Sequence, residues 1–160
     1  MNAALVPLHR TLELNTRLLL NALDGVDDEL ALKRPGESTN HIAFISCHLV
    51  ESRHYLAGCA GCDTESPFKQ LENARRLEDV SHFPAVEEIR AAWSDIGGIL
   101  GDRLPRLGET DLEAAVKYAF PIEGGESLLG CITFLVGHEA FHIGQIALLR
   151  RHFGLAALKY

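Results

Sequence analysis

The sequence lacks a strongly basic segment. Its 160 residues carry 15 lysines and arginines against 22 acidic residues, so the formal net charge is −7. Basic residues occur only in short runs such as Arg75-Arg76 and Arg150-Arg151, whereas a general nucleic-acid binder needs a basic patch or stripe. We therefore expect no nucleic-acid partner.

Long apolar runs are missing as well. No segment approaches the roughly 18 consecutive apolar residues of a membrane-spanning helix. Residues 1–15 lack the basic region, the apolar stretch and the small-residue cleavage site of a signal peptide. We expect a cytoplasmic protein without a membrane partner, in which the four cysteines stay reduced.

Strand-like alternation and internal repeats are also absent, and apolar residues recur at helical spacing instead. This pattern predicts four long helices at about 3–24, 39–58, 84–104 and 127–153. The third gives the most regular signal, with apolar residues three or four positions apart from Val86 to Leu104. Ser38 or Thr39 is expected to cap the second helix and Ser127 the last, because short polar side chains favour that position.

Length and composition are those of one ordinary globular domain, with 47% apolar and 23% charged residues. We predict a single domain over residues 1–160, all-α, folded as a four-helix bundle with long connecting loops. The connectors at 59–83 and 105–126 are long for a bundle, and such loops often carry function.

Two of the eight histidines are spaced for metal binding. His138 and His142 lie four residues apart on the last helix, which places both imidazoles on one face. That face is apolar, so buried imidazoles need partners, and a metal ion supplies both at once. His48, central in the second helix, is the expected third ligand. His41 and His54 are interpreted as surface or half-buried histidines.

The same segment spells H-E-x-x-H, in which a zincin peptidase uses the glutamate as general base. The downstream ligand of a zincin is missing, because Gln145 and Leu148 stand where the metzincin pattern needs Gly and His. No acidic residue follows Glu139. The peptidase interpretation is therefore disfavoured, and Glu139 is interpreted as a polar residue beside the site.

Two further residues are candidates for catalysis. Glu51, one turn after His48, is placed to act as a base or to orient a ligand. Gln145 faces the same side as His138 and can hydrogen-bond a substrate or fix an imidazole. Tyr55 is expected to pack in the core.

Cysteines and glycines suggest structural roles. Cys59 and Cys62 form a C-x-x-C motif without a second such pair, which favours two reduced cysteines near a helix end. Cys47 and Cys131 fit small core positions. Gly130, Gly137 and Gly144 recur every seven residues, which indicates close packing against a neighbouring helix or a second subunit, and we expect a homodimer.

Three segments resemble the DinB/YfiT-like family of four-helix-bundle metal-dependent proteins. NHIAFISCHLVESRHYLAG is similar to that family's second helix, FPAVEEIRAAW to the start of its third, and FLVGHEAFHIGQIALLRRHFGL to its last. The resemblance places the family's ligand histidines at His48, His138 and His142. It implies a divalent metal, zinc or nickel, with water in the open positions, and for some relatives a low-molecular-weight thiol cofactor.

The leading hypothesis is therefore a metal-dependent enzyme acting on a small-molecule substrate. The reaction is either a thiol-dependent transfer or isomerisation, or a hydrolysis at metal-bound water. The alternative hypothesis is a non-catalytic dimeric binding or stress-response module, with a structural metal or none.

Overall fold

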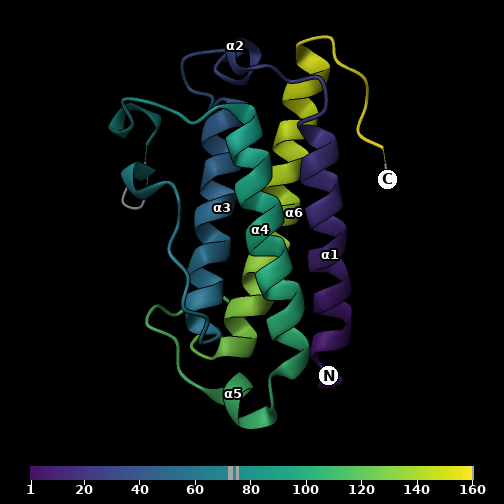
Figure 1. The fold of residues 1–160 in the computed structure, drawn as a ribbon, viewed down its shortest axis with the longest axis vertical. Coiled ribbons are helices and arrows are strands. Elements are labelled where there is room, and N and C mark those ends of the chain that lie inside the picture. The colour runs from purple at the N-terminus through teal and green to yellow at the C-terminus, as the bar shows by residue number, and fades with distance from the viewer. Residues whose placement is uncertain (72–73, 75, 160) are drawn as a thin grey trace.

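The chain folds into a bundle of four long helices (Figure 1). A computed structural model describes residues 1–71, 74 and 76–159. The long helices are α1 (Leu5–Ala22), α3 (Ile42–Cys59), α4 (Val86–Arg103) and α6 (Leu128–His152). The short ones are α2 (Asp28–Ala31), α5 (Glu109–Glu113) and the 3-10 turns η1 (Lys69–Leu71), η2 (Leu77–Asp79) and η3 (Leu104–Arg106). Within the described residues there is no strand, only a bridge between Ala115 and Ser127, so the all-α prediction is confirmed.

The four long helices form a square in which each contacts two neighbours. α6 packs against α1 and α3, and α4 packs against the same two helices from the opposite corner. α1 and α6 run in one direction, and α3 and α4 run in the other (Figure 1). Because α3 and α4 are parallel, the chain between them must return along the whole bundle. The long connector between α3 and α4, described at residues 60–71, 74 and 76–85, is therefore a crossover. It lies against the side of the bundle.

The helix ends agree with the sequence prediction to within three residues, but one cap differs. Ser127 caps α6 as expected, since its hydroxyl accepts a hydrogen bond from the Gly130 amide at 3.1 Å. The prediction of Ser38 or Thr39 for α3 is wrong. His41 occupies that position, and its Nδ1 accepts from the Phe44 amide at 3.0 Å. His41 is also buried, which corrects the expectation of a surface or half-buried histidine.

The core consists of two apolar clusters separated by a polar layer. One cluster includes Leu19, Leu49 and Ile146, and the other includes Leu12 and Leu56. Between them, at the middle level of the bundle, three polar side chains are buried, contributed by α1, α3 and α6: Asn15, Arg53 and Glu139. Polar groups at this depth require partners, and these are described below.

α6 differs from the other long helices in having an apolar outer face. By length and composition alone it is long and apolar enough to cross a membrane, a test that core helices of bundles also pass. A Cβ atom at Gly130 would lie 2.1 Å from the Gly124 carbonyl oxygen, so this glycine packs against its own connector. Gly137 and Gly144 face open space beside Phe141 and Leu148, which are 65% and 71% exposed. The homodimer expected on this face stays a prediction.

Candidate metal centre

The structure brings the three predicted histidines together. Nε2 of His138 lies 3.1 Å from Nε2 of His48 and 3.0 Å from Nε2 of His142. One potential ligand atom of each residue lies within 4.8 Å of the others. Among the described residues, this is the one group of three or more such side chains arranged to hold a metal ion. His48 comes from α3 and the other two from α6, so the contact between these helices forms the cluster.

Gln145 fixes the orientation of the His142 ring. Its Oε1 lies 2.7 Å from Nδ1 of His142. An amide oxygen only accepts hydrogen bonds, so Nδ1 carries the imidazole proton and Nε2 keeps its lone pair. That lone pair is directed at the cluster. The sequence-based interpretation of Gln145 as a residue that fixes an imidazole agrees with this geometry.

Burial keeps two of the rings neutral. Desolvation lowers the pKa of His48 to about 4, and the nearby His142 adds to the shift. The pKa of His138 is also lowered to about 4, first by burial and then by His142 and His48. At neutral pH both rings are therefore uncharged, which is the form that binds a metal ion.

The hydrogen bonds of the cluster are incomplete without a further group. Nδ1 of His138 is buried and has no hydrogen-bond partner in the described part of the chain. Its Nε2 faces two other ring nitrogens, and a neutral ring has one proton to share between its two sides. A cation at the centre would accept the lone pairs of all three Nε2 atoms; the His138 proton would then lie on Nδ1, which would still need an acceptor of its own. Two ligands on a tetrahedral zinc ion lie about 3.3 Å apart, close to the separations seen here, so the three residues fit such an ion.

A large cavity opens beside the histidines. It has a volume of about 940 Å³, and its lining includes His48 and His138. α3 and α6 form its floor, and the crossover and the connector before α6 supply the rest of its wall. Ligand cavities are commonly of this size. A molecule in the cavity would therefore reach the histidine cluster directly.

The other predicted residues on α3 also line this cavity. Glu51 accepts a hydrogen bond from the Ser66 hydroxyl, so the crossover holds its carboxylate. Tyr55 is half-buried: it packs against the apolar cluster that contains Leu12 and Leu56, as expected, and it also forms part of the cavity wall. His54 is half-buried as expected, with Nδ1 3.4 Å from the Thr64 hydroxyl.

Glu139 points away from the histidines, into the core. Its carboxylate binds Arg53 through two hydrogen bonds, 2.8 Å from Nε to Oε1 and 2.9 Å from Nη2 to Oε2. The side chains of Arg53 and Glu139 are 0% and 1% exposed. Asn15 donates a further bond to Oε2 at 3.1 Å. A zincin base must face the metal, so the H-E-x-x-H segment of this protein does not have the peptidase arrangement.

The remaining donors of Arg53 are directed at α1, and its flat face packs on α4. Nη1 donates to the Thr16 hydroxyl at 2.8 Å, and Nη2 donates to the Leu12 carbonyl at 3.1 Å. The guanidinium carbon lies 3.4 Å from the ring centre of Trp93. A Cβ atom at Gly97 would come within 2.9 Å of Nη1, so glycine leaves room for the arginine. No spacing or motif in the sequence indicates this cluster, which joins all four long helices.

The cysteines occupy structural positions. Cys47 and Cys131 are buried, as predicted, and Cys59 and Cys62 are half-buried against the apolar cluster that contains Leu12 and Leu56. Burial and the neighbouring Cys59 raise the pKa of Cys131 to about 12, so this thiol stays protonated. None of the four belongs to the group of potential metal ligands found in the described part of the chain.

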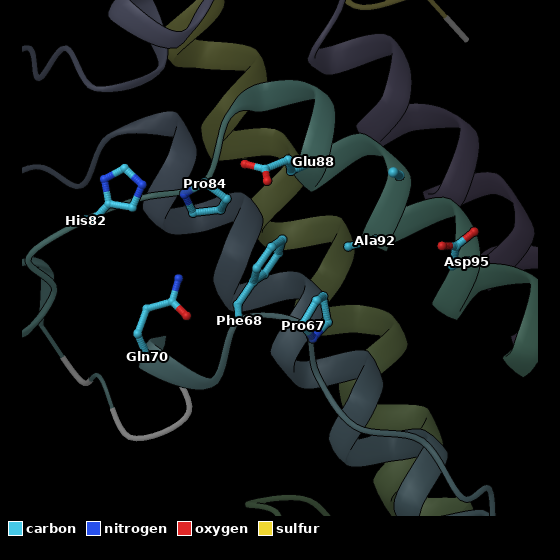
Figure 2. Close-up of a pocket in the computed structure, with 9 residues that line it drawn as sticks. Pro67, Phe68, Gln70, His82, Pro84, Glu88, Ala92 and Asp95 are labelled. Carbon is cyan, nitrogen blue, oxygen red and sulfur yellow. The ribbon is translucent and has the colours of Figure 1, made fainter.

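A second cavity lies between the crossover and α4. It has a volume of about 410 Å³ (Figure 2). Phe68 and Pro67 face Ala92 across it, and His82 stands at its far end (Figure 2). Its polar lining residues are exposed, and its described residues include no group of three potential ligands. The larger cavity is therefore the better candidate for the functional site.

Comparisons with known proteins agree with this fold. The family model of the DinB superfamily matches residues 11–146. The chain belongs to the DinB superfamily. A solved structure of a DinB-like protein from Bacillus cereus is similar over 96% of this chain and 95% of its own, with a TM-score of 0.73 and 17% sequence identity. At this identity the likeness shows the fold alone. No curated protein matches the sequence.

Proposed function

We propose that this DinB superfamily member is a metal-dependent enzyme. It holds one divalent cation, zinc or nickel, through Nε2 of His48, His138 and His142, and it acts on a small molecule bound in the adjoining cavity. The observation that carries the proposal is the convergence of these three ring nitrogens. Nε2 of His138 lies within 3.1 Å of Nε2 of both His48 and His142. Three neutral ligands leave coordination positions open, which is typical of catalytic rather than structural zinc sites.

A cation bound in this way supplies Lewis-acid chemistry, activating either a water molecule for hydrolysis or a thiolate for transfer. The protein's own residues hold and orient the reactants. Gln145 keeps the His142 proton on Nδ1. Glu51 stands on the cavity wall, one turn from His48, where its carboxylate is placed to accept a proton from a substrate or a water molecule. Its bond to Ser66 fixes the carboxylate in that position.

Metal analysis tests the proposal. Protein purified without nickel affinity resin and supplied with zinc or nickel should carry about one metal ion per chain. His142→Ala should lose most of it. His152→Ala is the matched control, because this histidine lies on the same helix but is exposed and outside the cluster. A folded wild-type protein that stays metal-free in the presence of zinc and nickel would overturn the proposal.

An activity screen then separates the two chemistries. Small esters and amides report hydrolysis, and conjugates of low-molecular-weight thiols report transfer. Turnover should depend on the metal, and Glu51→Gln should reduce it without reducing metal content. If the metal is retained and no substrate of either class is turned over, the catalytic part of the proposal fails.

The non-catalytic alternative is favoured by the exposed apolar residues Phe141 and Leu148 on α6, which suit contact with a second copy of the chain. Thermal melting with a chelator distinguishes the two. A structural metal contributes to folding energy, so its removal should unfold the protein. A catalytic metal should leave the bundle folded, because the apolar clusters are complete without it.

A further inference from the structure

Aromatic rings form a continuous ladder along the cavity and end at the histidine cluster. The ring of Phe134 stacks on His138, with centroids 5.9 Å apart and an interplanar angle of 23°. Phe120 stacks on Phe134 at 4.8 Å and 28°. Tyr55 meets Phe120 edge-on at 6.1 Å. All four rings belong to residues that line the cavity.

The outermost ring of the ladder belongs to Tyr118, which lies in the connector before α6. Its ring stacks on Tyr55, with centroids 6.1 Å apart and an interplanar angle of 29°. Tyr118 is 58% exposed, so the ladder runs from the protein surface to a candidate metal ligand. Phe134 is already stacked on both His138 and Phe120, so a planar, apolar ligand group would meet these rings at the parts that their neighbours leave uncovered, in offset or edge-to-face arrangements.

The charges around the cavity leave one lysine without an acidic partner. The described lining residues include two lysines and two glutamates, so their charges cancel. Lys69 pairs with Glu65 at 2.7 Å, and Glu51 is held by Ser66. Lys117 forms no ion pair with any described residue, and its Nζ lies 4.9 Å from the ring centre of Tyr118. An exposed cation that has no acidic partner among the described residues therefore lies over the outermost ring of the ladder.

A metal ion would make the other end of the ladder positive as well. Three neutral histidines leave the full charge of a dication in place, so the loaded cavity would carry a net charge of about +2 from its described residues and the ion. This sum already includes the Glu51 carboxylate on the cavity wall, so a cationic ligand would still meet a net positive charge. A purely apolar ligand would leave Lys117 and the metal without partners.

We propose that the cavity binds an anionic aromatic compound, with its planar body against Phe134 and Phe120 and its negative group at Lys117. This deepens the proposed function by naming the substrate class, and it rests on that function only for the charge at the histidine end. The volume of about 940 Å³ accommodates a drug-sized ligand. The reactive end of the compound then lies at the histidine cluster. The length of the ladder determines how far that end lies from the negative group at Lys117.

Two fluorescent probes of similar shape test the proposal on the full-length protein. 1-Anilinonaphthalene-8-sulfonate is aromatic and anionic, and N-phenyl-1-naphthylamine is its neutral counterpart. With zinc present, the anionic probe should bind the wild type more tightly than the neutral one. Lys117→Gln should weaken the anionic probe about threefold, as expected for one exposed charge pair, and leave the neutral probe unchanged. Lys33→Gln is the matched control, because this lysine pairs with Glu29 on α2, away from the cavity.

Ladder variants test the aromatic part. Phe134→Leu should weaken both probes about fivefold, as expected for the loss of one aromatic contact. Tyr118→Ser gives a second variant at an exposed position, where folding is not at risk, and it should weaken both probes by a smaller factor. Circular dichroism confirms that each variant is folded.

The outcomes separate this inference from the proposed function. Equal affinity for the two probes in the wild type, or an unchanged affinity in both ladder variants, would overturn the inference while leaving the metal site untouched. Repeating the titration on His142→Ala removes the metal. If the Lys117 and Phe134 effects persist there, the cavity binds anionic aromatic compounds whether or not the metal proposal holds.

Discussion

α3 and α6 meet at two polar clusters, and the two differ in how completely their polar atoms are satisfied. At the first, Arg53 and Glu139 are fully buried and bind each other through two hydrogen bonds, with further partners on α1. At the second, three half-buried histidines direct ring nitrogens at one another, and Nδ1 of His138 is buried without a partner. The first cluster is complete within the chain, whereas the second leaves three ring nitrogens facing one another and one buried Nδ1 unbonded among the described residues.

We interpret this difference as that between a structural role for the first cluster and the binding role proposed above for the second. A buried ion pair with its hydrogen bonds formed holds helices in one arrangement, and removing one member leaves an uncompensated charge. An incompletely bonded cluster beside a cavity is instead a place where a ligand supplies the missing partner. Glu139 follows His138 directly, so α6 carries one side of each cluster on adjacent residues.

The largest expected effect comes from breaking the first cluster. Arg53→Met leaves Glu139 buried without its cation and should lower the free energy of unfolding by about 3–5 kcal/mol. The double variant Arg53→Met/Glu139→Leu removes both charges and should return to within about 1 kcal/mol of the wild type. Urea unfolding measures both values. A single-variant loss below about 1 kcal/mol would show that the pair does not hold the bundle.

His41 can be compared with the histidine cluster, because it is a buried histidine whose Nδ1 has a backbone partner in the folded chain. Burial, followed by the nearby Arg34, lowers its pKa to about 4, against about 6.5 in the unfolded chain. The unfolded state then binds more protons between these two values, so this part of the stability is present above pH 6.5 and is lost as the pH falls towards 4. Protonated Nδ1 can no longer accept the Phe44 amide hydrogen.

Between pH 7 and pH 4.5 the contribution of His41 should fall by roughly 2.5 kcal/mol. His41→Asn keeps a side chain that caps helices well and does not titrate in this range. Unfolding measured at pH 7 and pH 4.5 with a chelator should show a smaller difference for this variant than for the wild type. Equal differences in the two proteins would exclude His41 as the source.

Gln145 tests the orientation of the second cluster. Gln145→Ala removes the acceptor that fixes His142 and should weaken zinc binding about tenfold, or about 1.4 kcal/mol. The free energy of unfolding of the metal-free protein should not change, because the side chain is exposed. Gln145→Glu keeps an acceptor oxygen and should retain most of the affinity. Calorimetric zinc titrations compare the three proteins, and identical affinities would contradict this role.

The smallest expected effect is on the stability of the metal-free protein. His142→Ala removes a half-buried ring from a cluster whose hydrogen bonds are incomplete. With a chelator present, the change in the free energy of unfolding should stay within about 1 kcal/mol. The loss of unfolding free energy in Arg53→Met should therefore be several times the loss in His142→Ala, and this ratio compares the two clusters most directly. A loss as large as the Arg53→Met value would make the histidine cluster a structural element.

The sequence predicted the long helices well and the short ones poorly. α4 shows why, since its apolar residues repeat over five turns and determine both its ends and its buried face. α2 and α5 contain only four and five residues, too few to show a period. His41 was missed as a cap because imidazole is not among the residues that usually take that position.

The histidine cluster was predictable because its spacing is local. His138 and His142 share a helix face by position alone, and His48 followed from its central place on the second helix. Arg53 and Glu139 offered no such signal, since their contact depends on how α3 and α6 pack across the core. The aromatic ladder was also missed, because Tyr118 and Phe120 lie in a connector without periodicity.

The most direct test of the central claim is the position of the metal in a crystal of the zinc-loaded protein. An anomalous difference map recorded at the zinc edge should show one peak per chain, about 2.0–2.1 Å from Nε2 of each of His48, His138 and His142. A zinc ion bound elsewhere, or no peak within reach of all three nitrogens, would contradict the account.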